Sequence, residues 1–310
     1  MGLPAYFCNF ACMNRLPWRD YASFLSGLFP CRMQKLAVNA GFTCPNRDGT
    51  VGRGGCVYCT NTSFSPAYCR PVIPVTEQLE EGKRFFARKY PSMRYLAYFQ
   101  SYTSTHGADV AALTALYHEA LSVDGVDGIV IATRPDCVPS PLIHALAGLP
   151  GKVIVELGAE SSHDTTLKRV NRCHTWAQTA DAVTRLHAAG IPVGLHLING
   201  LPGESSEMML RTVDAVSSLP VSTVKFHHLQ VLRGTPLSRD IPADMASFTP
   251  ESYARLCAAI VRRLRPDIAI DRFLAQAPPD MVISPRWGLK NYQFTAMVAA
   301  LIAPKPQNRH

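Results

Sequence analysis

Apolar runs and amphipathic segments alternate along most of the chain. Continuous apolar runs typical of buried parallel strands lie at residues 32–42, 94–100, 128–133, 152–158, 191–199 and 222–232. Between them, apolar residues recur with a helical period at 75–90, 109–122, 140–149, 175–189 and 204–219. Strands that alternate with helices in this way predict a parallel sheet covered by helices.

The number of these units narrows the fold class. Six strand–helix units lack the eight strands that close a TIM barrel, so we expect an α/β fold with a partial, open (β/α)6 TIM-like barrel. A doubly wound sheet is the alternative. Residues 1–32 show no clear period, and the region after residue 240 contains proline clusters and two helical segments at 250–265 and 291–303, with IAIDRF between them as a candidate strand. We therefore expect an N-terminal extension (1–32), a core barrel (33–240) and a C-terminal appendage (241–310) that closes one side of the barrel.

Composition excludes several classes of protein. The chain has no apolar run of about 18 residues and no basic segment followed by an apolar core at its start, so we expect a cytoplasmic protein without a membrane span. Disulfide frameworks are typical of small exported proteins. Ten cysteines in a large chain that we expect to stay in the cytoplasm therefore argue against such a framework. The net charge is +8, and residues 1–100 hold 12 Lys+Arg against 5 Asp+Glu. This local excess suits an anionic partner or substrate, although a solvated basic face is the commoner explanation.

Three closely placed cysteines form the main candidate for chemistry. Cys44, Cys56 and Cys59 lie in GFTCPNRDGTVGRGGCVYCTNTSF, where the glycines allow a tight loop. On a cluster of four irons, three thiolates leave one iron open to another ligand. With Cys69 as a fourth ligand the same cysteines could instead hold structural zinc, but zinc usually binds two C-x-x-C pairs and only one is present. The spacing alone leaves both readings open.

Further motifs extend the pattern beyond the cysteines. They are AYFQSYTST at 97–105, TRPDCVP at 133–139, VELGAES at 155–161, LKRVNRCH at 167–174 and HLINGLPGE at 196–204. Together with the cysteine loop, they resemble a bacterial radical SAM family related to elongator-subunit-3-like and oxygen-independent coproporphyrinogen oxidase-like proteins. The resemblance covers roughly residues 33–240 and implies a barrel of the radical SAM type.

The resemblance also implies cofactors and a reaction. Cys44, Cys56 and Cys59 would bind a [4Fe-4S] cluster whose open iron binds S-adenosyl-L-methionine. An external electron donor of the flavodoxin or ferredoxin type would supply the electron. Reductive cleavage of the sulfonium would then give methionine and a 5′-deoxyadenosyl radical, which abstracts hydrogen from the substrate. Because the cofactors carry this chemistry, we assign no catalytic side chain.

Six positions correspond to cofactor contacts in such proteins. By resemblance, Arg172 would pair with the methionine carboxylate, a role that suits a planar guanidinium. Other contacts with S-adenosylmethionine are implied for Tyr58, Gln100, Glu160, His196 and Gly200. Lys225 and His227 share one side of the last predicted strand, so both are candidates for touching substrate if that side faces the barrel interior.

The substrate is not specified by the sequence. An anionic small molecule and tRNA both suit the basic first hundred residues. A different class of function, a zinc-stabilised RNA-binding module without catalysis, is the alternative if Cys69 joins the other cysteines around one ion.

Overall fold

A parallel seven-stranded sheet forms the centre of the molecule. The computed structural model describes residues 16–60, 66–87 and 92–303. In the order β1-β2-β3-β4-β5-β6-β8, all neighbouring strands are parallel, which makes a curled, open barrel wall. These strands are Met33–Val38, Arg94–Phe99, Val126–Thr133, Lys152–Glu160, Val193–Asn199, Thr223–His228 and the two-residue Ala269–Ile270. The prediction of an open α/β barrel is confirmed, and IAIDRF contributes β8 as expected.

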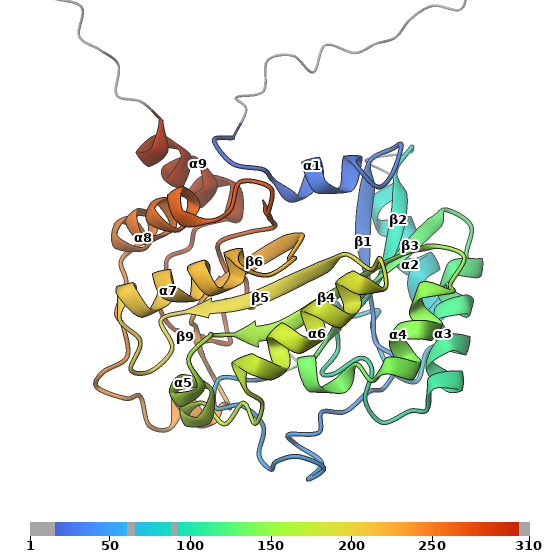
Figure 1. Ribbon diagram of the computed structural model, residues 1–310, viewed down its shortest axis with the longest axis horizontal. Coiled ribbons are helices and arrows are strands. Elements are labelled where there is room, and N and C mark those ends of the chain that lie inside the picture. Colours follow the sequence, from blue (N-terminus) through green and yellow to red (C-terminus); the bar gives the residue numbers. More distant parts are fainter. Residues whose placement is uncertain (1–15, 61–65, 88–91, 304–310) are drawn as a thin grey trace, which may run out of the picture.

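Helices cover the outer face of this wall, as Figure 1 shows. They are α2 (Val75–Ala87), α3 (Val110–Ser122), α4 (Ser140–Ala147), α5 (Asp164–Arg169), α6 (Trp176–Ala188) and α7 (Ser206–Ser217). Near each of the predicted helices the structure contains one, but residues 88–90 of the first prediction lie outside the described residues. Apolar strand positions such as Ile129, Val155 and Phe226 pack against the helices in one large core. Burial of these side chains accounts for the long apolar runs in the sequence.

The final predicted strand is shorter than expected. The apolar run at 222–232 breaks after His228, where the Leu229 N–H donates to Asn199 O at 2.9 Å. The chain then turns away, and β7 (Val231–Leu232) pairs antiparallel with β9 (Val282–Ser284). The single strand predicted from hydrophobicity is therefore two strands in two sheets, because both pieces are buried and hydrophobicity does not mark the turn.

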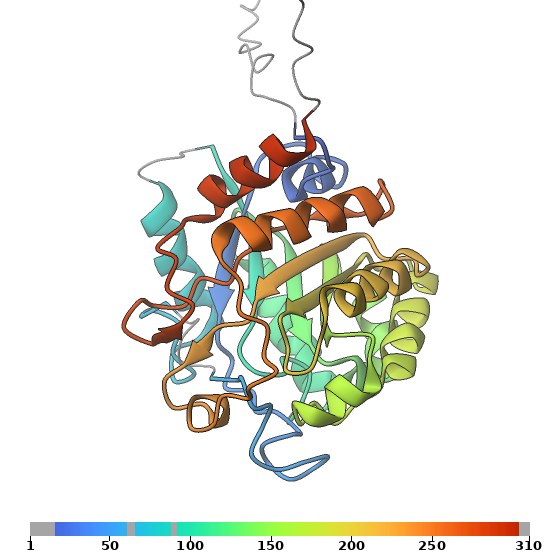
Figure 2. The ribbon, with the colours of Figure 1, turned by 90° about the vertical axis from the view of Figure 1, so that its left-hand side faces the viewer.

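The C-terminal region adds two helices beside the sheet. α8 (Pro250–Arg263) begins at a Thr249 capping box, and α9 (Asn291–Ile302) packs against it. Figure 2 shows both helices lying across one side of the strands. The domain boundaries at residues 32 and 240 stay predictions.

A short helix closes the end of the barrel opposite the cysteine loop. α1 (Tyr21–Ser26) begins at Asp20, whose side chain accepts from the Ser23 N–H at 2.8 Å. Six residues are too few to show a helical period, which is why sequence patterning missed this helix. Its neighbourhood buries Phe24, Leu25 and Phe29 against inward-facing strand residues Leu96, Val130, Ile154 and Ala269. In Figures 1 and 2 the cysteine loop lies at the other end of the strands.

Candidate active site

A cavity opens at the carboxyl ends of the strands. Its volume is about 700 Å³, within the usual range for a small-molecule site. The cysteine loop contributes one part of its lining, and inward-facing strand residues and segments outside the strands contribute the rest. All three candidate cluster cysteines line it, as do Tyr58, Gln100, Glu160, Arg172, His196 and His227. The cavity therefore brings together most of the residues selected from the sequence.

The cysteine loop curls so that its ligands face one side. The Arg47 and Asp48 N–H groups donate to Cys44 O, and the Cys59 N–H donates to Cys56 O at 3.0 Å. Gly54 and Gly55 adopt positive φ angles of 82° and 76°, which glycine tolerates without strain. Burial and the neighbouring Cys56 raise the pKa of Cys59 to about 11, while Arg47 and Arg172 oppose this increase. The guanidinium groups thus favour the thiolate form needed for iron binding.

Cys69 lies apart from these three residues. Its thiol donates to Ala37 O at 2.9 Å, and it is not among the residues that line the cavity. Burial raises the pKa of Cys69 to about 12. Cys8 and Cys12, a second candidate pair in the sequence, lie outside the described residues.

The donor set fits a cluster better than a single ion. Within residues 16–60, 66–87 and 92–303, no group of three or more His, Cys, Asp or Glu side chains could hold one metal ion. Ligands of a four-iron cluster bind different irons, so they need not converge on one point. Tyr58 Oη and Arg172 Nε are buried and lack a hydrogen-bond partner in the described structure. These polar atoms beside the three cysteines suit a bound cofactor with polar groups of its own.

The loop that carries Arg172 is tied to the cysteine loop. The Val57 N–H donates to Val170 O at 3.1 Å, and Asn46 Nδ2 donates to Asn171 O. Asn171 Nδ2 returns two bonds, to Arg53 O at 3.0 Å and Gly55 O at 2.8 Å. Asn171 has a φ of 54°, a conformation that asparagine adopts more readily than most residues. These bonds fix the relative positions of the cluster ligands and Arg172.

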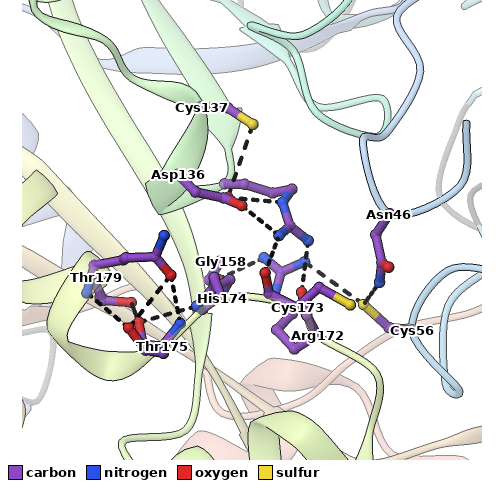
Figure 3. A network of polar contacts seen from close by, with 12 residues as sticks. Asn46, Cys56, Asp136, Cys137, Gly158, Arg172, Cys173, His174, Thr175 and Thr179 are labelled. Carbon is purple, nitrogen blue, oxygen red and sulfur yellow. Dashed lines mark hydrogen bonds and ion pairs between the residues drawn. The ribbon is translucent and has the colours of Figure 1, made fainter. Parts of the chain in front are cut away.

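Figure 3 shows how Arg172 itself is held. Its Nη2 donates to Gly158 O at 2.6 Å and lies 3.5 Å from Glu160 Oε1, while Nη1 lies 3.7 Å from Cys56 Sγ. His174 Nε2 is 3.1 Å from the same Gly158 O, where it acts as a donor. Burial and the nearby Arg172 lower the pKa of His174 to about 3, so the imidazole is neutral near pH 7.

A second arginine, Arg134, donates hydrogen bonds to the loop that carries Arg172. Arg134 is almost fully buried and donates to Arg172 O at 2.9 Å and to Cys173 O at 3.4 Å. Its guanidinium pairs with both carboxylate oxygens of Asp136, at 2.9 and 2.7 Å. The motif TRPDC noted in the sequence therefore positions the Arg172 loop, a role that sequence reasoning did not assign.

Two other predicted cofactor residues, Glu160 and Gln100, stand at strand ends. Glu160 ends β4 with a φ of 68°, next to an irregularity in the pairing with β5. Burial raises the pKa of Glu160, although Arg172 and Arg134 oppose this. Gln100 directly follows β2 and lines the cavity. Their contacts with S-adenosylmethionine stay predictions.

His196 and Gly200 have protein neighbours at the positions predicted to touch the cofactor. His196 Nε2 lies 2.7 Å from Glu156 Oε2 on the cavity floor. Gly200 is not among the cavity-lining residues; a Cβ added there would meet Phe248 at 3.3 Å. Its φ of 93° explains why glycine is needed in this turn. Direct contact of either residue with the cofactor remains a prediction.

The middle of the barrel contains a charged network that sequence reasoning missed. Glu156 Oε2 accepts from Lys225 Nζ at 2.7 Å and from Tyr98 Oη at 2.8 Å, while Oε1 accepts from Lys35 Nζ at 2.6 Å. Asp271 Oδ2 lies 3.1 Å from Lys35 Nζ. Single charged residues inside otherwise apolar strands were a hint in the sequence, but they do not reveal which residues pair with one another.

Lys225 and His227 share one side of β6, as their alternation predicted, and this side faces the barrel interior. Burial and the charge of Arg272 hold the pKa of His227 well below its usual value. Burial also lowers the pKa of Lys225, against the opposing effect of Glu156. The cavity floor is therefore a polar surface formed by strand residues.

Family models match both halves of the chain. The model described as the radical SAM superfamily matches residues 43–216, and the model described as the radical SAM C-terminal domain matches residues 221–303. No helix within the described residues is long and apolar enough to cross a membrane.

Individual relatives agree with these matches. The chain is 34% identical over 273 residues to YtqA of Bacillus subtilis, covering 87% of this chain and 84% of that protein. It is 35% identical over 260 residues to YhcC of Escherichia coli K12, covering 83% and 82%. Its fold resembles that of Elp3 from Methanocaldococcus infernus, with a TM-score of 0.67 at 15% identity over 87% of this chain and 62% of that one.

Proposed function

The chain belongs to the radical SAM superfamily, and from this premise we infer that its barrel cavity is where S-adenosylmethionine is cleaved and a substrate loses a hydrogen atom. Members of this family use a [4Fe-4S] cluster and S-adenosylmethionine and require an external electron donor. When bound, these groups supply reductive cleavage of the sulfonium and hydrogen abstraction.

One observation carries the assignment of the site. Cys44, Cys56 and Cys59 line the same cavity as Arg172, and Arg172 Nη1 is 3.7 Å from Cys56 Sγ. We assign the cysteines to the cluster and Arg172 to the methionine carboxylate next to it. The other predicted contacts, Tyr58 with the adenine and Gln100, Glu160, His196 and Gly200 with the remaining polar groups, belong to the same proposal.

The chain's own residues orient the substrate and exclude water. α1 covers the far end of the barrel with apolar side chains, at the opposite end from the cysteine loop. Exclusion of water protects a reactive carbon centre from side reactions. The inner-face residues Tyr98, His196 and His227 form the surface on which a substrate would lie.

Arg47 and Arg53 on the cysteine loop are exposed, which favours an acidic electron donor of the flavodoxin or ferredoxin type. The same exposed cations favour tRNA as a second candidate substrate. Phosphate contacts release counterions, so binding of tRNA would weaken steeply with salt, whereas a small anion would show a shallow dependence and no retention of tRNA. Filter binding of bulk tRNA from about 50 to 200 mM salt distinguishes these cases.

Stimulated turnover tests the proposal. The reconstituted, reduced protein is mixed with either the small-molecule fraction or the tRNA fraction of a cell extract, and 5′-deoxyadenosine is measured. We expect the small-molecule fraction to raise its formation above the rate without substrate. Stimulation only by tRNA supports the second candidate, and no stimulation by either fraction contradicts both.

A further inference from the structure

Two arginines on the cavity lining, Arg47 and Arg272, belong to no ion pair found among the described residues; Arg47 is exposed to solvent, whereas Arg272 is half-buried. Arg272 follows Asp271 directly after β8, at the opposite edge of the sheet from β1 and the cysteine loop. Its Nε is buried without a hydrogen-bond partner, and none of the ion pairs found among the described residues includes its guanidinium. By contrast, Arg134 pairs with Asp136, and Arg172 pairs with Glu160.

The neighbouring charges already balance one another. Glu156 and Asp271 are two anions, and each lies within 3.4 Å of both Lys35 and Lys225, which are two cations. Burial and nearby cations lower the pKa of His196 to about 4 and hold that of His227 well below its usual value, so neither ring adds charge near pH 7. Arg272 therefore leaves this part of the barrel with one positive charge in excess.

This excess becomes costly when a substrate fills the cavity. Water in the open cavity can hydrate the guanidinium, but a bound substrate displaces that water. A buried charge without a partner is strongly unfavourable, whereas a charge-assisted pair with an anion is favourable. A substrate that brings its own anionic group avoids this penalty, and a neutral one does not.

We infer that Arg272 binds a carboxylate group of the substrate. The inference rests on the proposed function, since it places the substrate in the cavity beside the cofactor. The planar fork of a guanidinium matches the two oxygens of a carboxylate. Because Arg172 lies beside the cluster cysteine Cys56 and Arg272 on the segment after β8, the two arginines separate the methionine carboxylate from that of the substrate. Arg272 is thus the residue that selects acidic substrates.

Ligand-detected NMR tests this inference without turnover. The protein is reconstituted with its cluster, saturated with S-adenosylmethionine so that Arg172 is occupied, and left unreduced. Saturation-transfer difference spectra are recorded with acetate and, separately, with methylphosphonate. The variants are Arg272→Met, Arg272→Lys and, as a control, Arg255→Met, which removes an exposed arginine on α8.

We expect wild type and Arg255→Met to bind acetate equally. Arg272→Met should bind acetate about tenfold or more weakly than wild type. The affinity of Arg272→Lys should be intermediate, because lysine retains the positive charge but lacks the two parallel N–H donors of a guanidinium. Unchanged acetate binding in Arg272→Met, or no acetate signal in wild type, overturns the inference. Preference for methylphosphonate overturns the assignment to a carboxylate.

The two proposals can fail separately. Formation of 5′-deoxyadenosine by the reduced wild-type protein tests the proposed function, whereas acetate binding is measured before reduction. If Arg272→Met fails to fold, as judged by its melting temperature, acetate binding is compared between Arg272→Lys and wild type. Weaker binding by Arg272→Lys then supports the inference, and equal binding overturns it.

Discussion

Arg172 Nη1 lies 3.7 Å from Cys56 Sγ, so a fixed cation stands beside one of the three cavity cysteines. A ligand carboxylate that reaches a metal cluster at this place would lie within range of the same guanidinium. The two residues come from segments 116 positions apart, and hydrogen bonds between their loops hold them together.

Removal of Arg172 should weaken binding of S-adenosylmethionine. We expect Arg172→Ala to lose roughly 1.5–3 kcal/mol of binding free energy, the usual value of a hydrogen bond to a charged group. Arg172→Lys should recover part of this loss. Arg169→Ala is a matched control, because Arg169 forms only an exposed pair with Asp244. Calorimetry on reconstituted protein measures all three variants, and wild-type affinity in Arg172→Ala would contradict the assignment.

Substitution of the four cysteines of the loop region should have different effects on the iron content of the protein. Cys44→Ala, Cys56→Ala and Cys59→Ala are each expected to abolish the cluster, since each removes one of three protein ligands. Cys69→Ala should retain it, because this thiol instead donates to Ala37 O. Iron and sulfide are assayed after anaerobic reconstitution. Loss of iron in Cys69→Ala would contradict a cluster held by only these three cysteines, and one zinc with no iron in wild type would support the zinc alternative.

The tie between the two loops should control how firmly the cluster is held. Asn171→Ala removes two hydrogen bonds and places alanine at a φ of 54°, so we expect faster release of iron to a chelator. The lost bonds and the backbone strain should together cost about 2–4 kcal/mol. Asn171→Gly removes the same bonds, but glycine adopts this positive φ without strain, so this variant should release iron at an intermediate rate. Equal rates in wild type and Asn171→Ala would mean that these bonds do not hold the cluster loop.

Glu156 should be important for stability as well as for the shape of the cavity. Its side chain is only 2% exposed, and Glu156→Gln leaves two buried lysines short of an anion. We expect a loss of about 3–5 kcal/mol in the free energy of unfolding at pH 7. Glu81→Gln, which breaks an exposed pair with Arg84, should change it little. Urea unfolding measures both variants.

The effect of Glu156→Gln should shrink in acid. Burial alone raises the pKa of Glu156, but Lys225 and Lys35, with His196, hold it well below the usual value. A carboxylate whose pKa is lower in the folded state stabilises the protein above its unfolded pKa of about 4.3 and loses this contribution as the pH falls below that value. The difference between wild type and Glu156→Gln should therefore decrease from pH 5 towards pH 3. A difference that is constant over this range would exclude the ionised network.

The barrel could be predicted from the sequence because the alternation of apolar runs with amphipathic segments is repeated along the chain. Each apolar run, such as the one around Ile129, reports burial on the outer, helix-covered face of the sheet. The inner face is different: Glu156 and Lys35 look out of place in their strands until curvature of the sheet brings them within 2.6 Å. Pairing between residues 121 positions apart leaves no local pattern, so this network emerged only from the structure.

That the three cysteines would lie together at one cavity could be predicted from the sequence because they are near one another in the chain. Cys56 and Cys59 are close in sequence, and the loop itself brings Cys44 near them. The role of Arg134 was not predictable. Asp136 lies in the same short motif, but the Arg172 carbonyl belongs to a loop far away in the sequence, and no local pattern reveals that contact. Similarly, Gly200 fits a turn against Phe248, a neighbour 48 residues later that no short motif reveals.

The most direct test of the central claim is cleavage of S-adenosylmethionine by the protein alone. Anaerobically reconstituted wild type is reduced with dithionite, and the products are separated by chromatography, with Cys56→Ala as the control that lacks a cluster ligand. We predict slow formation of 5′-deoxyadenosine by wild type and none by Cys56→Ala. Wild-type protein that holds an intact cluster and binds S-adenosylmethionine, yet forms no 5′-deoxyadenosine, would contradict the assignment of this cavity as a radical SAM active site.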